Sequence, residues 1–97
     1  MPQNLNMFSL EGKTALVTGA NTGLGQGICA AYAGAGANVI GVARRSCQET
    51  ADKITAIGGN FTELIADLSD INVIPHIVEE AGKAYGRVDI LVNNAGI

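Results

Sequence analysis

The sequence is poor in the residues that nucleic-acid-binding and metal-binding proteins use. Of its 97 residues, 4% are aromatic and 15% are charged, with a formal net charge of −3 and no basic cluster. These values argue against a nucleic-acid partner, which needs a dense basic patch. Cys29 and Cys47 stand at no metal-ligand spacing, and reduced thiols are typical of a cytoplasmic protein. His76 is the single histidine and has no cysteine or second histidine at ligand spacing, so we expect no metal site.

Long apolar runs are also lacking, and a signal peptide is not expected. No apolar run reaches the roughly 18 residues of a membrane span. Met1–Asn6 does not have the basic and then apolar build of a signal peptide. We therefore expect a soluble, cytoplasmic protein without a membrane partner. Apolar residues nevertheless make up 47% of the chain, as expected of a parallel sheet that is covered on both faces.

Short apolar runs, rich in β-branched residues, recur four times along the chain. The strands that they predict are Thr14–Thr18, Asn38–Val42, Phe61–Ala66 and Val88–Val92. A helix-length segment separates each strand from the next, which is the spacing that parallel strands need. Right-handed crossovers then give a doubly wound α/β sheet of the Rossmann type, in the strand order 3-2-1-4. A ligand crevice is expected at the carboxyl ends of its strands.

Three helical segments fill the intervals between these strands. The first is expected to end at Gly36 in a left-handed cap. The second should begin at a capping box formed by Ser46 and Glu49. The third has Asn72 as a candidate cap and Pro75 in its first turn. The predicted apolar faces are Leu24, Ile28, Ala31 and Ala35 in the first helix, and Ile74, Ile77, Val78, Ala81 and Tyr85 in the third.

A glycine-rich turn joins the first strand to the first helix and reads T-G-A-N-T-G-L-G from Thr18 to Gly25. Gly19 permits a tight exit from the strand, Gly23 lets backbone approach a pyrophosphate, and Gly25 lets the helix pack on the sheet. The first turn of the helix offers free N–H groups and a partial positive charge to phosphates. The alternative is a purely structural turn, but such a turn needs fewer permissive glycines. The motif therefore predicts a dinucleotide site.

This spacing resembles that of the short-chain dehydrogenase/reductase family, and three further motifs agree with it. They are Asp67-Leu68-Ser69 after the third strand, Gly86-Arg87-Val88-Asp89-Ile90-Leu91-Val92 leading into the fourth, and Asn93-Asn94-Ala95-Gly96 after it. The resemblance extends from about Leu10 to Ile97. The strings Phe8–Lys13, Thr22–Gly27 and Ile74–Pro75 resemble the sugar-acid branch of the family, which includes 2-deoxy-D-gluconate 3-dehydrogenase.

The resemblance implies which residues would contact NAD(P). Those around the pyrophosphate and its ribose would be Gly19, Asn21, Thr22, Gly23, Leu24 and Gly25. Asp67 and Leu68 would meet the adenine, although Asp67 could instead be a solvated loop acid or a helix cap. Asn94, Ala95 and Gly96 would line the nicotinamide ribose side, and the asparagine would also brace the sheet.

The choice between NAD and NADP depends on the end of the second strand. An acid there pairs with the ribose hydroxyls of NAD, whereas an arginine accommodates the 2′-phosphate of NADP. Ala43 stands where the family's NAD users carry the acid, and Arg44 and Arg45 follow it. We therefore expect NADP to be preferred and NAD tolerated. Two adjacent arginines can also be no more than a solvated loop.

The family's catalytic Tyr-x-x-x-Lys pair has no counterpart here. Gly36 stands four residues after Tyr32, and Asp89 stands four residues after Tyr85. Residues 1–97 are expected to be the N-terminal part of an NAD(P)-binding Rossmann domain, truncated before the catalytic segment. The parent would be an oxidoreductase that acts on a small molecule such as 2-deoxy-D-gluconate and assembles as a homodimer or homotetramer. A 3-oxoacyl reductase of the same fold and a non-catalytic nucleotide-binding module are the alternatives.

Overall fold

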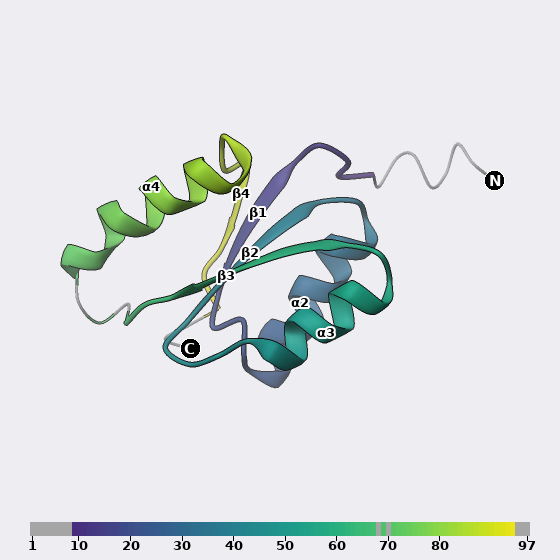
Figure 1. The fold of residues 1–97 in the computed structure, drawn as a ribbon, viewed down its shortest axis with the longest axis horizontal. Coiled ribbons are helices and arrows are strands. Elements are labelled where there is room, and N and C mark those ends of the chain that lie inside the picture. Colours follow the sequence, from purple (N-terminus) through teal and green to yellow (C-terminus); the bar gives the residue numbers. More distant parts are fainter. Residues whose placement is uncertain (1–8, 68, 70, 95–97) are drawn as a thin grey trace.

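Strands and helices alternate along the chain in a computed structural model, which describes residues 9–67, 69 and 71–94 (Figure 1). In chain order the elements are β1 (Thr14–Thr18), α2 (Gly23–Gly34), β2 (Asn38–Ala43), α3 (Gln48–Ala56), β3 (Asn60–Ile65), η1 (Ile71–Val73), α4 (Ile74–Tyr85) and β4 (Ile90–Val92). The α/β alternation predicted from the sequence is confirmed, with boundaries that shift by one or two residues.

The strands form one parallel sheet in the order β3-β2-β1-β4. β1 lies at its centre, with Leu16 beside Ile40 of β2 on one side and beside Leu91 of β4 on the other. This arrangement confirms the doubly wound fold and the strand order 3-2-1-4. All carboxyl ends therefore open on one edge of the sheet, and the loops after β1, β2, β3 and β4 meet there.

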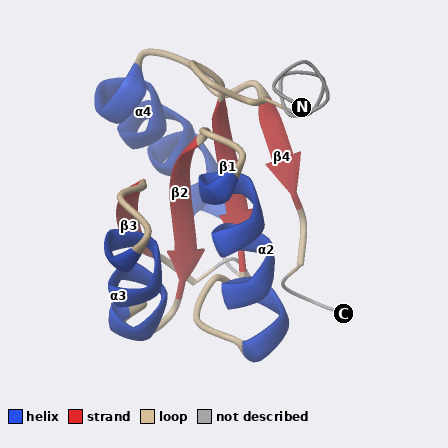
Figure 2. Cartoon of the chain, turned by 90° about the vertical axis from the view of Figure 1, so that its right-hand side faces the viewer, coloured by secondary structure: helices blue, strands red, loops and turns tan. Residues whose placement is uncertain are grey.

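Helices cover both faces of the sheet: α2 and α3 pack on one face and α4 on the other (Figures 1 and 2). Successive side chains of a strand point to opposite faces, so each strand contributes to two cores. The core under α2 and α3 contains Val17, Ala20, Cys29, Ala33, Val39, Ala43, Cys47 and Ile54. The core under α4 contains Leu16, Ile40, Val42, Ala66, Ile77 and Ala81. Among the described helices, none is long and apolar enough to cross a membrane.

The buried face of α2 differs from the predicted apolar face. Gly25, Cys29 and Ala33 turn toward the sheet, whereas Leu24 is 64% exposed and Ala31 is exposed as well. The small residues bring the helix close to the sheet, a contact that the branched side chains would prevent. Of the predicted face, Leu24 and Ala31 are wrong, whereas Ile28 is partly buried against the core.

The starts of α3 and α4 also differ from the prediction. Cys47, not Ser46, is the N-cap of α3, and it makes no side-chain cap bond. The hydroxyl of Ser46 instead accepts a hydrogen bond from the backbone N–H of Gln48 at 3.2 Å. The N-cap of α4 is Val73 rather than Asn72. The reason is that η1 already forms a helical turn through Asn72.

The buried face of α4 is narrower than predicted. Pro75 lies in the first turn as expected, where no intrahelical hydrogen bond is lost. Ile77 and Ala81 are buried against the sheet, but Ile74 and Val78 are exposed. Two of the five predicted residues of this face are therefore wrong, because a single helix on an open sheet face can bury only a narrow stripe.

Candidate functional site

The turn after β1 is closed by hydrogen bonds to the carbonyl oxygen of Gly19. Gly19 has φ +66°, a conformation that residues with a Cβ rarely adopt. Its carbonyl accepts hydrogen bonds from the backbone N–H of Thr22 at 3.2 Å and from the Thr22 hydroxyl at 2.9 Å. That hydroxyl oxygen also accepts from the N–H of Gly25 at 2.9 Å, which makes Thr22 the N-cap of α2.

Asn94 connects the loop after β4 to the same turn. It is 9% exposed, and its side-chain Nδ2 donates to the carbonyl of Gly19 at 3.2 Å and to the hydroxyl of Thr22 at 3.3 Å. Its backbone N–H donates to the hydroxyl of Thr18 at 2.9 Å. The neighbouring Asn93 is exposed, and its Oδ1 accepts from the same hydroxyl at 3.2 Å. Asn94 thus braces the glycine turn itself as well as the strands beside it.

Gly23 and Gly25 are glycines for different structural reasons. A Cβ on Gly25 would lie 1.9 Å from the carbonyl oxygen of Gly19, so any side chain there would break the turn. This reason is more local than the helix packing that the sequence suggests. A Cβ on Gly23 would meet nothing within 4 Å. The space in front of Gly23 is therefore open to a ligand.

The first turn of α2 fits a phosphate group. The first N–H groups of a helix have no intrahelical partner. Within the described ranges, the N–H groups of Gly23 and Leu24 donate to no protein acceptor. Gly23 and Leu24 are both exposed, and a Cβ on Gly23 would meet nothing within 4 Å, so there is room for a ligand beside this turn. Free donors at the positive end of a helix dipole bind anions, and a pyrophosphate is the group that this cradle suits.

Charged residues follow the next two strands at the same edge of the sheet. Arg44 and Arg45 are exposed after β2, and Asp67 is exposed after β3. The Oδ1 of Asp67 accepts hydrogen bonds from the hydroxyl of Ser69 at 2.7 Å and from its N–H at 2.9 Å. These bonds hold the pKa of Asp67 below its usual value, and the positive charge of Arg44 lowers it further. Asp67 therefore closes its own turn with Ser69 and is not the N-cap of α4, and its contact with an adenine stays a prediction.

A polar pocket of about 150 Å³ lies between the glycine turn and the start of α3. Its lining residues are Asn21, Gln26, Ser46, Cys47, Gln48 and Glu49. Asn21 was predicted from the sequence as a site residue, but Gln26 was not. In the sequence, Gln26 is a polar residue on the face of α2 that otherwise carries small residues. Such a position can indicate a buried polar side chain, and Gln26 is 8% exposed.

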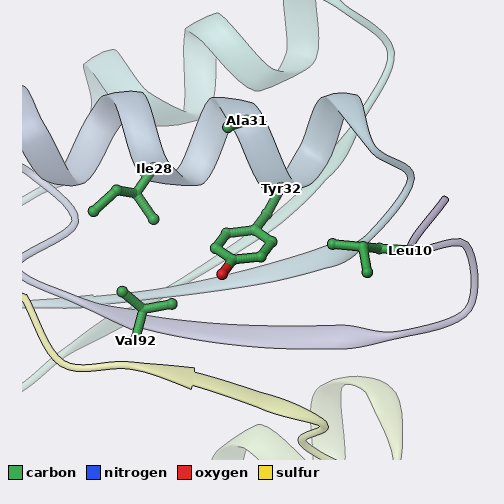
Figure 3. A pocket seen from close by; sticks show the side chains of 5 residues that line it. All are labelled: Leu10, Ile28, Ala31, Tyr32 and Val92. Carbon is green, nitrogen blue, oxygen red and sulfur yellow. The ribbon is translucent and has the colours of Figure 1, made fainter. Parts of the chain in front are cut away.

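A larger pocket of about 450 Å³ is apolar and lies beside α2 (Figure 3). Its lining residues are Leu10, Ile28, Ala31, Tyr32 and Val92. Figure 3 shows the ring of Tyr32 pointing from α2 toward the sheet, between Leu10 and Val92. Among the described residues, its lining carries no carboxylate, amine or imidazole beside the Tyr32 ring, so this part of the pocket offers mainly hydrophobic contact.

The two cysteines belong to the core. Burial raises the pKa of the Cys29 thiol to about 12, and burial also raises the pKa of Cys47. Both thiols are therefore protonated at neutral pH, and neither is an activated nucleophile.

One possible metal-ligand group lies on α4, where the sequence analysis expected none. Ligand atoms of His76, Glu79 and Glu80 lie within 4.8 Å of one another. The prediction of no metal site rested on the lack of cysteine and histidine partners, whereas Glu79 and Glu80 stand three and four residues after His76 on the same helix. All three side chains are at least partly solvent-accessible, and Glu80 already pairs with Lys83 at 3.2 Å. Of the remaining predicted site residues, Leu68, Ala95 and Gly96 lie outside the described residues.

The family assignment follows from a direct match. A model of the family described as short chain dehydrogenase matches residues 13–97, which include the whole sheet and the glycine turn. The chain belongs to the short-chain dehydrogenase family. The resemblance predicted from the four motifs is thereby confirmed.

Curated relatives of this short-chain dehydrogenase chain carry sugar-acid names. It is 52% identical over 93 residues to 2-dehydro-3-deoxy-D-gluconate 5-dehydrogenase of Dickeya dadantii, and 47% identical over 93 residues to the Escherichia coli protein of that name. Each match covers 96% of this chain but 37% of the relative. The chain therefore spans little more than a third of the length of these relatives, and the similarity to the sugar-acid branch is confirmed.

Solved structures are similar to this chain in both fold and sequence. A short-chain type dehydrogenase/reductase from Mycobacterium marinum matches with a TM-score of 0.91 and 40% identity, over 96% of this chain and 38% of that one. A protein from Agrobacterium tumefaciens described as a 2-deoxy-D-gluconate 3-dehydrogenase, with bound NADP, matches with a TM-score of 0.83 and 52% identity. That match covers 95% of this chain and 35% of the other.

The glycine turn yields a prediction about two neighbouring glycines of α2. Gly25→Ala places a methyl group against the carbonyl of Gly19 and should destabilise the protein by about 1–3 kcal/mol. Gly27→Ala meets nothing within 4 Å and should stabilise the helix by up to about 1 kcal/mol. Urea unfolding followed by circular dichroism measures both effects. Changes of the same sign and size would show that the turn does not restrict Gly25.

Proposed function

We propose that this chain is the N-terminal, cofactor-binding part of an NAD(P)-dependent oxidoreductase. The reaction would transfer a hydride between a nicotinamide and the hydroxy or keto group of a sugar acid, such as 2-deoxy-D-gluconate. The observation that carries the proposal is the open pair of N–H groups at Gly23 and Leu24, in a turn held by the Gly19 carbonyl. When bound, the nicotinamide supplies the hydride chemistry.

In this proposal the residues of the chain bind and orient the cofactor. The N–H groups of Gly23 and Leu24 hold the pyrophosphate, with Gly19, Asn21, Thr22 and Gly25 shaping the turn around it. Asn94 fixes the position of the turn relative to the end of β4, because its side chain donates hydrogen bonds to Gly19 and Thr22. The segments after β3 and β4, with Asp67 and Leu68 and with Ala95 and Gly96, would contact the adenine and the nicotinamide ribose.

We further propose that NADP is preferred over NAD. Arg44 and Arg45 are exposed at the carboxyl end of β2, and the residue before them is Ala43 rather than an acid. A guanidinium binds a 2′-phosphate by paired, charge-assisted hydrogen bonds. The Asp67 carboxylate already accepts two hydrogen bonds from Ser69, and its interaction with Arg44 is electrostatic. The Arg44 guanidinium therefore keeps its hydrogen-bond donors for a phosphate. The NADP-bound Agrobacterium relative supports this choice.

The proton-transfer step would belong to residues beyond position 97. Tyr32 points into an apolar pocket, and the hydroxyl of Tyr85 bonds to the hydroxyl of Thr62 at 2.9 Å on the α4 face of the sheet. Among the described residues, no lysine or histidine forms a hydrogen bond with either hydroxyl. Neither tyrosine is therefore placed as a general acid or base. The parent enzyme would be cytoplasmic and would assemble as a dimer or tetramer.

Cofactor preference is tested by substituting the first arginine. In the full-length natural protein, Arg44→Ala should weaken NADPH binding by about ten- to a hundredfold and leave NADH binding nearly unchanged, because only NADPH carries the 2′-phosphate. The dissociation constants follow from the rise in reduced-nicotinamide fluorescence on binding. Lys83→Ala, an exposed cation on α4, is the control. Tighter binding of NADH than of NADPH by the wild type would refute the preference.

Substrate class is tested by steady-state assays of the full-length natural protein. With each nicotinamide, turnover is expected on hydroxy and keto sugar acids and not on simple 3-oxoacyl esters. The isolated 97-residue chain should show none, because loss of the general acid/base alone costs about 10²–10⁴-fold in rate. Activity restricted to acyl ketones would favour the 3-oxoacyl reductase. Complete inactivity with bound cofactor would favour a nucleotide-binding module.

A further inference from the structure

Helix α3 reaches across to the glycine turn through Thr50. This side chain is fully buried, and its hydroxyl donates a hydrogen bond of 2.7 Å to the carbonyl of Ala20. The N–H of Ala20 donates to the carbonyl of Val42 in β2 at 3.3 Å. The backbone of Ala20 is thus held by β2 through its N–H and by α3 through its carbonyl.

A second connection joins α3 to the next residue of the turn. The Nε2 of Gln26 donates to the carbonyl of Asn21 at 3.3 Å, and the Oε1 of Gln26 accepts from the ammonium of Lys53 at 2.6 Å. Gln26 is buried, so the amide cannot rotate freely toward water. Thr50 and Lys53 are three residues apart and so lie on the same face of α3, turned toward the turn.

Together these contacts engage three consecutive carbonyls. Gly19 is held by Thr22 and Asn94, Ala20 by α3 directly, and Asn21 by α3 through Gln26. A carbonyl oxygen that rotated toward the ligand side would repel a phosphate, and the rotation would turn the neighbouring N–H groups away. Holding the carbonyls therefore keeps the anion-binding side of the turn free of negative dipoles.

We propose that Thr50 and the Lys53–Gln26 pair are positioning residues for the dinucleotide pyrophosphate, acting from α3 through the carbonyls of the turn. The inference rests on the proposed function, because it assumes that the turn binds a dinucleotide. In this proposal, Thr50, Lys53 and Gln26 do not contact the cofactor themselves, but they determine how tightly the turn binds it. A merely structural role would change the stability of the protein without changing its preference between ligands with and without a pyrophosphate.

The test compares two ligands in the full-length natural protein: NADPH, which has a pyrophosphate, and adenosine 2′-monophosphate, which has none. Thr50→Val keeps the shape but removes the hydroxyl, leaving the Ala20 carbonyl buried without its donor. It should weaken NADPH binding about three- to tenfold and change adenosine 2′-monophosphate binding less than about twofold. Thr50→Ser keeps a hydroxyl and should restore most of the affinity. Thr55→Val, on the exposed side of α3, is the control.

Lys53 provides the second variant, because it is exposed and its loss should not prevent folding. Lys53→Met should weaken NADPH binding about two- to fivefold and again spare adenosine 2′-monophosphate. Isothermal titration calorimetry measures both ligands in every variant.

Three results would decide against the proposal. NADPH affinities of Thr50→Val and Lys53→Met within twofold of the wild type would overturn it. Equal losses for both ligands would overturn it as well, since they would indicate a general loss of structure or a direct contact of Lys53 with the 2′-phosphate. A wild-type protein that binds no nicotinamide dinucleotide would overturn the proposed function itself, and the inference with it.

Discussion

The carbonyl oxygen of Gly19 is the point on which the rest of the site depends. It accepts hydrogen bonds from Thr22, which starts α2, and from Asn94, which follows β4. The left-handed conformation of Gly19 makes this meeting possible, because it turns the chain sharply at the end of β1. Gly25 must then lack a side chain, since a Cβ would lie against the same oxygen. Hydrogen bonds to one carbonyl oxygen therefore hold the end of β1, the start of α2 and the loop after β4 together.

The sheet order explains why the loops that follow β1 and β4 can cooperate. β4 pairs with β1 although 71 residues, 19–89, separate the end of β1 at Thr18 from the start of β4 at Ile90, and the crossovers through α2, α3 and α4 bring it there. The backbone N–H of Thr14 donates to the Asp89 carboxylate at 2.9 Å at the opposite end of the pair, which holds the pKa of Asp89 below its usual value. Side-chain hydrogen bonds thus fix both ends of the β1–β4 pair. They hold the carboxyl ends of these strands, where the cofactor would bind, in a fixed relative position.

Sequence patterns predicted the parts of the fold that depend on local chemistry. The strand order, the glycine turn and the left-handed Gly36 just after α2 follow from β-branched runs, glycine spacing and crossover handedness. The buried face of α2 did not, because close packing selected Cys29 and Ala33 over bulkier apolar residues such as Leu24. The contacts of the site with α3 could not be predicted either. Thr50 and its acceptor are 30 residues apart, and no local pattern marks a threonine that donates to a distant carbonyl.

Hydrogen–deuterium exchange with and without NADPH tests most directly the central claim, that the held turn presents its N–H groups to the cofactor. At saturating NADPH, the account predicts slower exchange in peptides spanning residues 19–27 and 44–47 of the full-length natural protein. Peptides spanning residues 74–85 in α4, on the other face of the sheet, should exchange as before. Unchanged exchange at residues 19–27 in a protein shown to be saturated with NADPH would contradict the account.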